Sequence, residues 1–274
     1  MTWRDWRRLG PATTGPAVLA IDFGPGRAAA GFAELAPRLG GGLMLLEPPF
    51  TAPAPEAAGH GAPGPMVRAW AAEAARHPEG VAGVLGFCSG SALACALAEA
   101  LEESGLPRPA LILFDPEFAD APLLRHYFEA AIRSFEGVLD TAELTEALAR
   151  GRHAAAPDRY AGMPPLAVEL TGIYREMAMK ACISAGMDDE FGQQLTERLG
   201  AFLGYLATTG EVDAGVPRRA TERDEAEVLI SAEHTPPPDY GTGTRAFDVA
   251  RTHLLDDQDV ADAVMELLAK ETAR

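Results

Sequence analysis

Five residues near the end of the first third of the chain have the spacing of a nucleophile elbow. The pentapeptide Gly86-Phe87-Cys88-Ser89-Gly90 separates a short apolar run from a helical pattern rich in Ala and Leu. In such an elbow the nucleophile lies on a sharp, strained turn, and the flanking Gly86 and Gly90 avoid clashes with the strand and the helix. The N-terminus of the helix places positive dipole near the sulfur, so we expect a lowered pKa and a thiolate at Cys88. The pattern therefore predicts nucleophilic catalysis by Cys88.

The alternative interpretation of Cys88 is a buried structural cysteine in a glycine-rich turn, because free cysteine is often buried. Cys95 lies two turns further along the same predicted helix, and Cys182 lies in a later helical region. We expect both to be core residues. Three unevenly spaced cysteines do not form a disulfide framework and are typical of a reducing cytoplasm, where we expect the protein to be.

A nucleophile of this kind needs a base and an acid that orients it, in the chain order nucleophile, acid, histidine. Asp115 directly follows the apolar run 110–114 and is the predicted acid. The alternative is that Asp115 and the following proline only start a turn. Asp22 is a weaker candidate because it precedes the nucleophile, and Asp120 is the nearest substitute.

His253 is the predicted base, because it lies after the last predicted strand and just before the final helix. His234 follows that strand in a proline-rich segment and resembles a turn residue. The alternative for His253 is an exposed loop position. The other histidines either precede the elbow or lie in the helical middle of the chain: His60, His77, His126 and His153.

Oxyanion stabilisation requires two backbone N–H groups aimed at the reacting oxygen. Ser89, which follows the nucleophile, is expected to supply one of them. The second is expected from the loop 24–27, where Pro25 has no N–H, so Gly26 or Arg27 is the predicted donor. An ordinary tight turn is the alternative interpretation of this loop.

The elements that position these residues alternate along the first part of the chain. Short apolar runs bounded by turn residues predict strands, and helical periodicity predicts helices between them. The expected strands are 16–23, 43–46, 81–85 and 110–114, and the expected helices are 28–39, 66–76 and 89–103. This alternation predicts an α/β fold with a mostly parallel central sheet flanked by helices.

The alternation stops after Asp115, and residues 119–210 carry only helical patterns. Strand pattern returns at 227–231, and a last helix is expected at 259–270. We therefore predict an α/β core formed by residues 1–118 and 211–274, with residues 119–210 inserted as a large helical lid.

Composition excludes several classes of function. The formal net charge of −17 disfavours binding to nucleic acid or to anionic membrane surfaces, and 47% hydrophobic residues argue against disorder. The N-terminus lacks a signal-peptide pattern, and the uncharged segment 80–98 is interrupted by the glycines and serines of the elbow, so no membrane span is expected. No metal-ligand spacing occurs, and Gly24-Pro25-Gly26 lacks the third glycine of a dinucleotide-binding loop.

Four segments together resemble the thioesterase family of nonribosomal peptide and polyketide synthases, within the α/β-hydrolases. They are AVLAIDFGPGRAAAGFAELAPRL, VLGFCSGSALA, LILFDP and THLLDDQDVADAVMELL, in the family's order over nearly the whole chain. The resemblance implies an α/β-hydrolase fold with a helical lid, an acid at Asp115 and a base at His253. The chain departs from the family in having Cys88 where most members have serine, and in lacking the glycine and aromatic residue that often flank the histidine.

The resemblance implies an enzyme that takes an acyl, aminoacyl or peptidyl group from the phosphopantetheinyl thioester of a carrier protein onto Cys88. It would release the group by hydrolysis or transfer, with no cofactor of its own. An acyl group on Cys88 is again a thioester, nearly equal in energy to its donor, so shuttling between carrier proteins is an alternative. A small ester or lactone hydrolase and a non-catalytic binding protein of the same fold are further alternatives.

Overall fold

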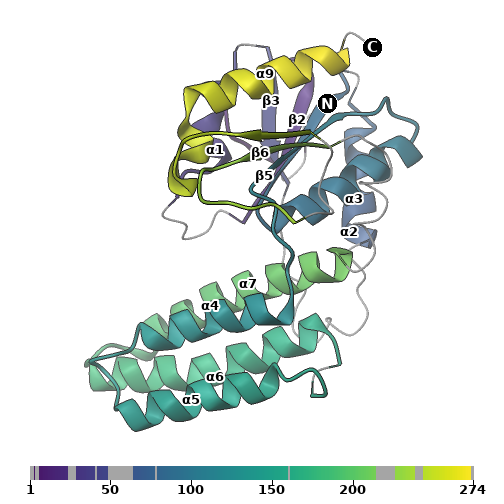
Figure 1. Ribbon diagram of the computed structural model, residues 1–274. Helices are drawn as coiled ribbons and strands as arrows, with labels where there is room; N and C mark the ends of the chain where they lie inside the picture. The colour runs from purple at the N-terminus through teal and green to yellow at the C-terminus, as the bar shows by residue number, and fades with distance from the viewer. Residues whose placement is uncertain are drawn as a thin grey trace. The chain divides into compact units, whose positions relative to one another are not determined.

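The computed structural model describes residues 3, 6–23, 29–40, 42–48, 64–77, 79–159, 161–213, 226–237 and 243–272. These residues form two compact units, which are described separately (Figure 1). The first is an α/β unit from the N-terminal and C-terminal parts of the chain. The second is a helical unit that begins at Ala119 and ends at Glu211.

The α/β unit is built on a seven-stranded sheet with the order β1-β3-β2-β4-β5-β6-β7. Every neighbouring pair is parallel except β1 and β3. The strands are β1 (Arg7–Arg8), β2 (Ala17–Ile21), β3 (Met44–Glu47), β4 (Val81–Phe87), β5 (Ala110–Phe114), β6 (Ala226–Ile230) and β7 (Gly243–Ala246). The predicted mostly parallel sheet is confirmed, and the central strands β2, β4 and β5 are the apolar runs that predicted it.

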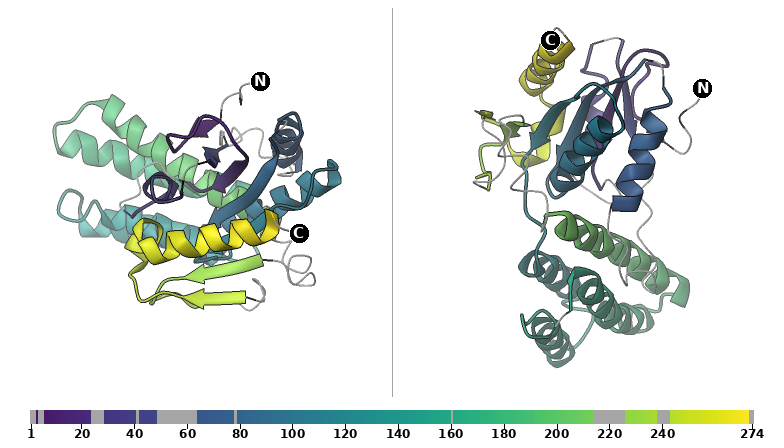
Figure 2. Two further views of the ribbon diagram at one scale, coloured as in Figure 1. Left: turned by 90° about the horizontal axis from the view of Figure 1, so that it is seen from above. Right: turned by 90° about the vertical axis from the view of Figure 1, so that its right-hand side faces the viewer.

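Helices cover both faces of this sheet (Figure 2). On one face, β4 and β5 pack against α9 (Gln258–Thr272), and α1 (Phe32–Leu35) packs against the 3₁₀ helix η2 (Arg251–Asp256). On the other face lie α2 (Gly64–Ala74) and α3 (Gly90–Glu103). The first face buries a continuous apolar cluster from the sheet, α1, η2 and α9. Burial on both faces explains why the central strands are uninterrupted apolar runs.

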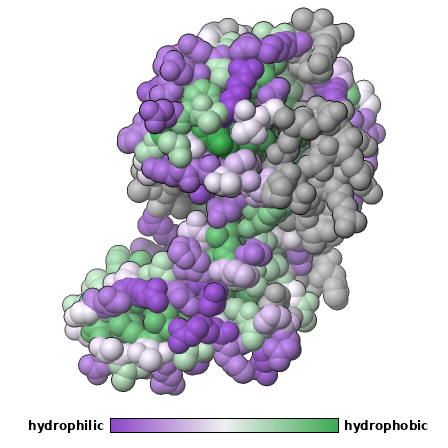
Figure 3. All heavy atoms as spheres, in the orientation of Figure 1, coloured by the Kyte–Doolittle hydropathy of each residue, from purple (hydrophilic) through white to green (hydrophobic). Residues whose placement is uncertain are grey.

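In the described residues, the helical unit consists of four helices of 13 to 25 residues. They are α4 (Ala121–Arg133), α5 (Thr141–Ala154), α6 (Met163–Ser184) and α7 (Asp189–Asp213), the last of which ends just beyond the unit boundary. α6 packs against both α4 and α5. A Cβ at Gly151 would lie 2.1 Å from a ring carbon of Phe128, so a glycine lets α5 approach α4. Figure 3 shows apolar side chains between polar ones on the visible face of these helices.

Two strands were not predicted from the sequence. β1 has two exposed arginines, and β7 (GTRA) alternates between exposed and half-buried residues, so neither has an apolar run. Both are edge strands, where one side of the backbone needs no partner and burial is slight. No helix within the described ranges is long and apolar enough to cross a membrane.

Candidate functional site

Cys88 lies on a sharp turn between β4 and α3, as the elbow pattern predicts. Its φ is +55°, in the left-handed region that a side chain with a Cβ rarely adopts. A Cβ at Gly86 would lie 2.7 Å from the Cβ of Ala94, so glycine is required where the helix crosses the strand end. Ser89 is the N-cap residue of α3, and its backbone N–H donates a hydrogen bond to the sulfur of Cys88. The turn thus presents the sulfur at the carboxyl end of the sheet.

Asp115 occupies the same position at the end of the neighbouring strand β5. Its φ is +40°, and it is the only non-glycine residue besides Cys88 with a positive φ in the part of the chain that the structure describes. The carboxylate is fully buried and accepts hydrogen bonds from the backbone N–H and the hydroxyl of Ser231, both at 2.8 Å. Backbone strain of this kind persists only where the surroundings hold it and often marks functional sites.

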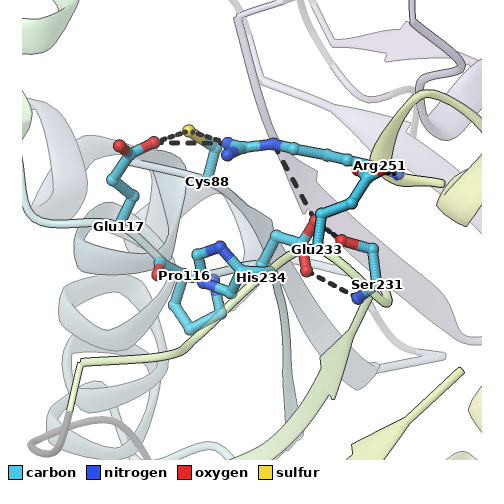
Figure 4. A network of polar contacts seen from close by, with 8 residues as sticks. Cys88, Pro116, Glu117, Ser231, Glu233, His234 and Arg251 are labelled. Carbon is cyan, nitrogen blue, oxygen red and sulfur yellow. Dashed lines mark hydrogen bonds and ion pairs between the residues drawn. The ribbon is translucent and has the colours of Figure 1, made fainter.

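The side chain of Arg251 reaches from η2 across the strand ends to the sulfur (Figure 4). Its Nη2 donates to the Sγ of Cys88 at 2.9 Å and to Oε2 of Glu117 at 3.2 Å. Its Nε lies 3.8 Å from Oδ2 of Asp115. The guanidinium also lies 5.7 Å from the centre of the Phe87 ring. Arg251 therefore joins the predicted nucleophile to the predicted acid.

Glu117 completes the cluster, which we call the Cys88–Glu117–Arg251 cluster. The thiol of Cys88 donates to Oε2 of Glu117 at 3.1 Å, and the same oxygen accepts from Arg251. Glu117 follows β5 by three residues, so it reaches the sulfur from the loop that also carries Asp115. Neither Glu117 nor Arg251 was among the residues predicted from the sequence.

The expected thiolate at Cys88 is not what this environment favours. Burial, together with the negative charge of Glu117, raises the pKa of the Cys88 thiol to about 12. Arg251 and the Ser89 N–H act in the opposite direction without compensating. The prediction of a lowered pKa neglected desolvation, which disfavours the charged form of any buried acid. At neutral pH the resting site therefore holds a protonated thiol.

The structure does not bring His253 to the sulfur. Its side chain is 69% exposed and lies 3.3 Å from Asp256, on the outer side of η2. No hydrogen bond joins it to Cys88 or Asp115 among the residues described. The structure thus brings Cys88 and Asp115 to Arg251 and leaves His253 outside this cluster, so the predicted Cys88, Asp115 and His253 triad stays a prediction.

The other residues considered as acid or base have different surroundings. His234 lies with Nε2 2.9 Å from the carbonyl oxygen of Pro116, and Asp120 caps α4 by accepting from the N–H of Leu123. His77 stacks on Trp3. His126 lies in α4 and His153 in α5, within the helical unit. Asp22 accepts a hydrogen bond from the backbone N–H of Phe23.

Gly26, Arg27 and His60 lie outside the described residues, so the second oxyanion donor stays a prediction. Cys95 and Cys182 are buried within helices, as expected for core residues. No group of three or more His, Cys, Asp or Glu side chains suited to a metal ion occurs in the described part of the chain.

Two signals in the sequence could have pointed to the missed residues. Glu117 lies two positions after Asp115, at the same strand end, and Arg251 lies two positions before His253, in the segment expected to deliver the base. Residues at the carboxyl ends of neighbouring parallel strands meet at one edge of the sheet. Charged residues next to the predicted acid and the predicted base were therefore candidates for contact with the sulfur.

Comparison with known proteins supports the fold. No protein-family model and no curated protein matches the chain. A structure of the Vlm2 thioesterase domain, with genetically encoded 2,3-diaminopropionic acid and bound with a dodecadepsipeptide, matches 98% of this chain and 98% of that chain with a TM-score of 0.51 and 19% identity. A second crystal form of it (space group H3) gives the same TM-score and coverage at 18% identity.

The chain also matches a crystal structure of holo-AB3403, a four-domain nonribosomal peptide synthetase bound to AMP and glycine. The TM-score is 0.55 at 13% identity, over 97% of this chain and 20% of that one. At these identities the likeness concerns the fold. The protein has the α/β-hydrolase fold of thioesterase domains, and the predicted fold class is confirmed.

Proposed function

We propose that the protein is a thioesterase-like enzyme of natural-product biosynthesis, in which Cys88 carries the acyl group. The donor would be an acyl, aminoacyl or peptidyl thioester on the phosphopantetheine of a carrier protein. The enzyme would release the group by hydrolysis or by transfer to an acceptor, with no cofactor of its own.

One observation carries this proposal: Cys88 is held at a φ of +55° on the strand-to-helix elbow, with the Ser89 N–H directed at its sulfur. The strained backbone at Cys88 does not stabilise the fold, because glycine would form the same turn with less strain. A positive φ at a nucleophile aims its side chain away from the sheet, toward incoming substrate. The similarity in fold to thioesterase domains agrees with this chemistry.

Intact-protein mass spectrometry tests the proposal directly. The full chain is mixed with an acyl-loaded carrier protein or with an acyl-pantetheine thioester and quenched with acid, which preserves thioesters. We expect the wild-type protein and Cys95→Ala to gain the mass of the acyl group and Cys88→Ala to gain none. Absence of the adduct on the wild type, or its persistence on Cys88→Ala, would overturn the assignment.

The substitution Cys88→Ser separates hydrolysis from shuttling. An acyl group on serine is an oxoester, lower in energy than the donor thioester, so it does not return readily to a second thiol. If the enzyme shuttles acyl groups, the variant should acquire the group and fail to pass it to a second carrier protein. If it hydrolyses them, product should still form. Matched oxoester and thioester substrates distinguish either role from a small-ester hydrolase, which would turn over the oxoester at least as fast.

A second candidate is a non-catalytic protein that keeps the fold for binding or assembly. It is favoured by the raised pKa of Cys88 and by the outward direction of His253. Slow alkylation of Cys88 near neutral pH is expected for both candidates, because both contain the protonated thiol. Acylation by a thioester is therefore the measurement that distinguishes them.

A further inference from the structure

The proton of the Cys88 thiol has a defined acceptor. Within the described residues, the carboxylate of Glu117 is the group that accepts a hydrogen bond from the sulfur, at 3.1 Å. This distance is within the reach required of a general base. Glu117 is half-buried, with 31% of its side chain exposed, so the carboxylate can also exchange protons with solvent or with an incoming acceptor.

Arg251 cannot take the proton, because a guanidinium stays charged at any ordinary pH. It donates to the sulfur and to the Glu117 oxygen that accepts from the sulfur. Burial opposes the charge on Arg251, but Cys88 and the two neighbouring carboxylates raise its pKa overall. The cation is thus fixed beside the two atoms on which negative charge forms or disappears during thiol chemistry.

We propose, building on the function proposed above, that Glu117 and Arg251 divide the work that a single histidine performs in a Cys-His-Asp triad. Glu117 is the general base and acid, and Arg251 is the cation that stabilises negative charge at the sulfur and on the substrate. Asp115 is a positioning residue. Its hydrogen bonds from Ser231 fix the carboxylate at the strand end, and its Oδ2, 3.8 Å from Nε of Arg251, attracts the guanidinium to that place.

The acylation step balances with these groups alone. The sulfur of Cys88 attacks the thioester carbon while its proton passes to Oε2 of Glu117, and a new C–S bond forms. The C–S bond to the carrier thiol then breaks, and Glu117 returns the proton to the departing sulfur. The products are acylated Cys88 and a free carrier thiol. In the second half, the acceptor attacks the acyl carbon while its proton passes to Glu117, and a new bond from the acceptor to the acyl carbon forms. The C–S bond to Cys88 then breaks, and Glu117 returns the proton to the sulfur, which restores the Cys88 thiol.

Concerted proton transfer fits the resting state of the site. The pKa of the free thiol is about 12, because the sulfur is buried, so prior ionisation is unfavourable at neutral pH. As the new C–S bond forms, the remaining S–H becomes far more acidic, and a carboxylate is then a sufficient base. A neighbouring cation lowers the energy of the oxyanion that develops at the same time.

The substitution Glu117→Gln tests the proposal, because it keeps the size of the side chain and removes the basic oxygen. In quenched-flow acylation by an acyl-pantetheine thioester, we expect a loss of about 10²-fold or more relative to wild type. Alkylation by iodoacetamide at one fixed pH should become faster, because the charge of Glu117 no longer raises the pKa of Cys88. Glu266→Gln, which alters an exposed carboxylate paired with Arg245, is the matched control.

A loosened site would also lose acylation and alkylate faster, because exposure removes the burial that raises the pKa of Cys88. An unchanged free energy of unfolding in Glu117→Gln, together with recovery of acylation in a carboxylate variant, excludes that structural role. Glu117→Asp, which keeps a carboxylate on a shorter side chain, should recover part of the acylation rate. Acylation of Glu117→Gln at the wild-type rate would overturn the proposal while the function proposed above stands. A wild-type protein that takes no acyl group would overturn both. Loss of acylation in His253→Asn with an unaffected Glu117→Gln would overturn it in favour of the histidine.

Discussion

Arg251 and His253 are two residues apart in the same 3₁₀ helix and have opposite surroundings. Arg251 contacts Cys88, Glu117 and Asp115, and 34% of its side chain is exposed. His253 contacts Asp256, and 69% of its side chain is exposed. The difference follows from helix geometry, because residues three apart in a 3₁₀ helix eclipse one another, whereas residues two apart point to different sides.

The neighbours of both residues obey this rule. Leu254, three residues after Arg251, is fully buried on the inner side of η2, and Asp256, three residues after His253, lies with it on the outer side. The side chain of η2 that reaches the sulfur is therefore the one on the same side of the helix as Leu254. A histidine near the expected position in the sequence does not predict a base at the sulfur when the local helix directs its side chain outward.

The largest predicted effect is a difference in the acylation rate of Cys88 between variants of Arg251 and of His253. Arg251→Met keeps much of the side-chain length and removes the cation, and we expect acylation of Cys88 to fall about 10²–10³-fold, as when a preorganised donor is removed from an acyl-transfer site. His253→Asn should change the rate by no more than about twofold, because an exposed residue that touches neither reacting group contributes little. Rates come from quenched-flow mass spectrometry, with Arg245→Met as the control for loss of a surface arginine.

The outcome that contradicts this comparison is a large loss in His253→Asn with Arg251→Met close to wild type. That result would mean that η2 rotates in the working enzyme to bring the predicted histidine to the sulfur. It would restore the Cys88, Asp115 and His253 triad.

The fold was predictable because its central elements carry unambiguous patterns. β2, β4 and β5 are buried on both faces and consist of apolar runs, and α3 follows β4 through a glycine-flanked turn. The edge strands β1 and β7 escaped prediction because exposed strands need no apolar pattern. The helix expected at 28–39 is described only as the single turn Phe32–Leu35, with residue 28 outside the described ranges.

The site was predictable where a residue's position is fixed by a strand end. Cys88 and Asp115 directly follow β4 and β5, and hydrogen bonding between these neighbouring strands brings them together. The pKa of Cys88 and the identity of its partners depend on side-chain directions in η2 and in the loop after β5. A linear pattern does not contain those directions, so Arg251 and Glu117 were missed.

The next largest predicted effect is a difference in the free energy of unfolding between variants of Asp115, which faces Arg251, and of Asp256, which faces His253. Asp115→Asn weakens the hydrogen bonds from Ser231 and removes the buried charge facing Arg251, so we expect a loss of about 1–3 kcal/mol in the free energy of unfolding. Asp256→Asn should cost less than about 0.5 kcal/mol, because its partner is exposed. Urea denaturation of both variants measures the difference. Equal losses would show that the contacts of Arg251 contribute no more to stability than those of His253.

The buried Cys88 thiol should make the free energy of unfolding decrease at alkaline pH. The pKa of Cys88 is raised to about 12 in the folded protein from 9.0, so the folded state holds its proton more tightly than the unfolded state. The contribution to stability is complete below about pH 9 and is lost progressively as the pH rises toward 12. Urea denaturation at pH 8 and pH 10.5 should show a larger decrease for wild type than for Cys88→Ala. Parallel decreases would contradict the raised pKa, because the other titrating groups are common to both proteins.

The smallest effect concerns the outward pair itself. The exposed pair of His253 and Asp256, three residues apart on one helical turn, contributes at most a few tenths of a kcal/mol. In a double-mutant cycle of His253→Asn and Asp256→Asn, we therefore expect a coupling energy below about 0.5 kcal/mol. A coupling of several times that size would mean that His253 is held by more than Asp256. Because an inward-facing histidine would be held by Asp115, measuring the same cycle between His253 and Asp115 decides whether η2 has the orientation described.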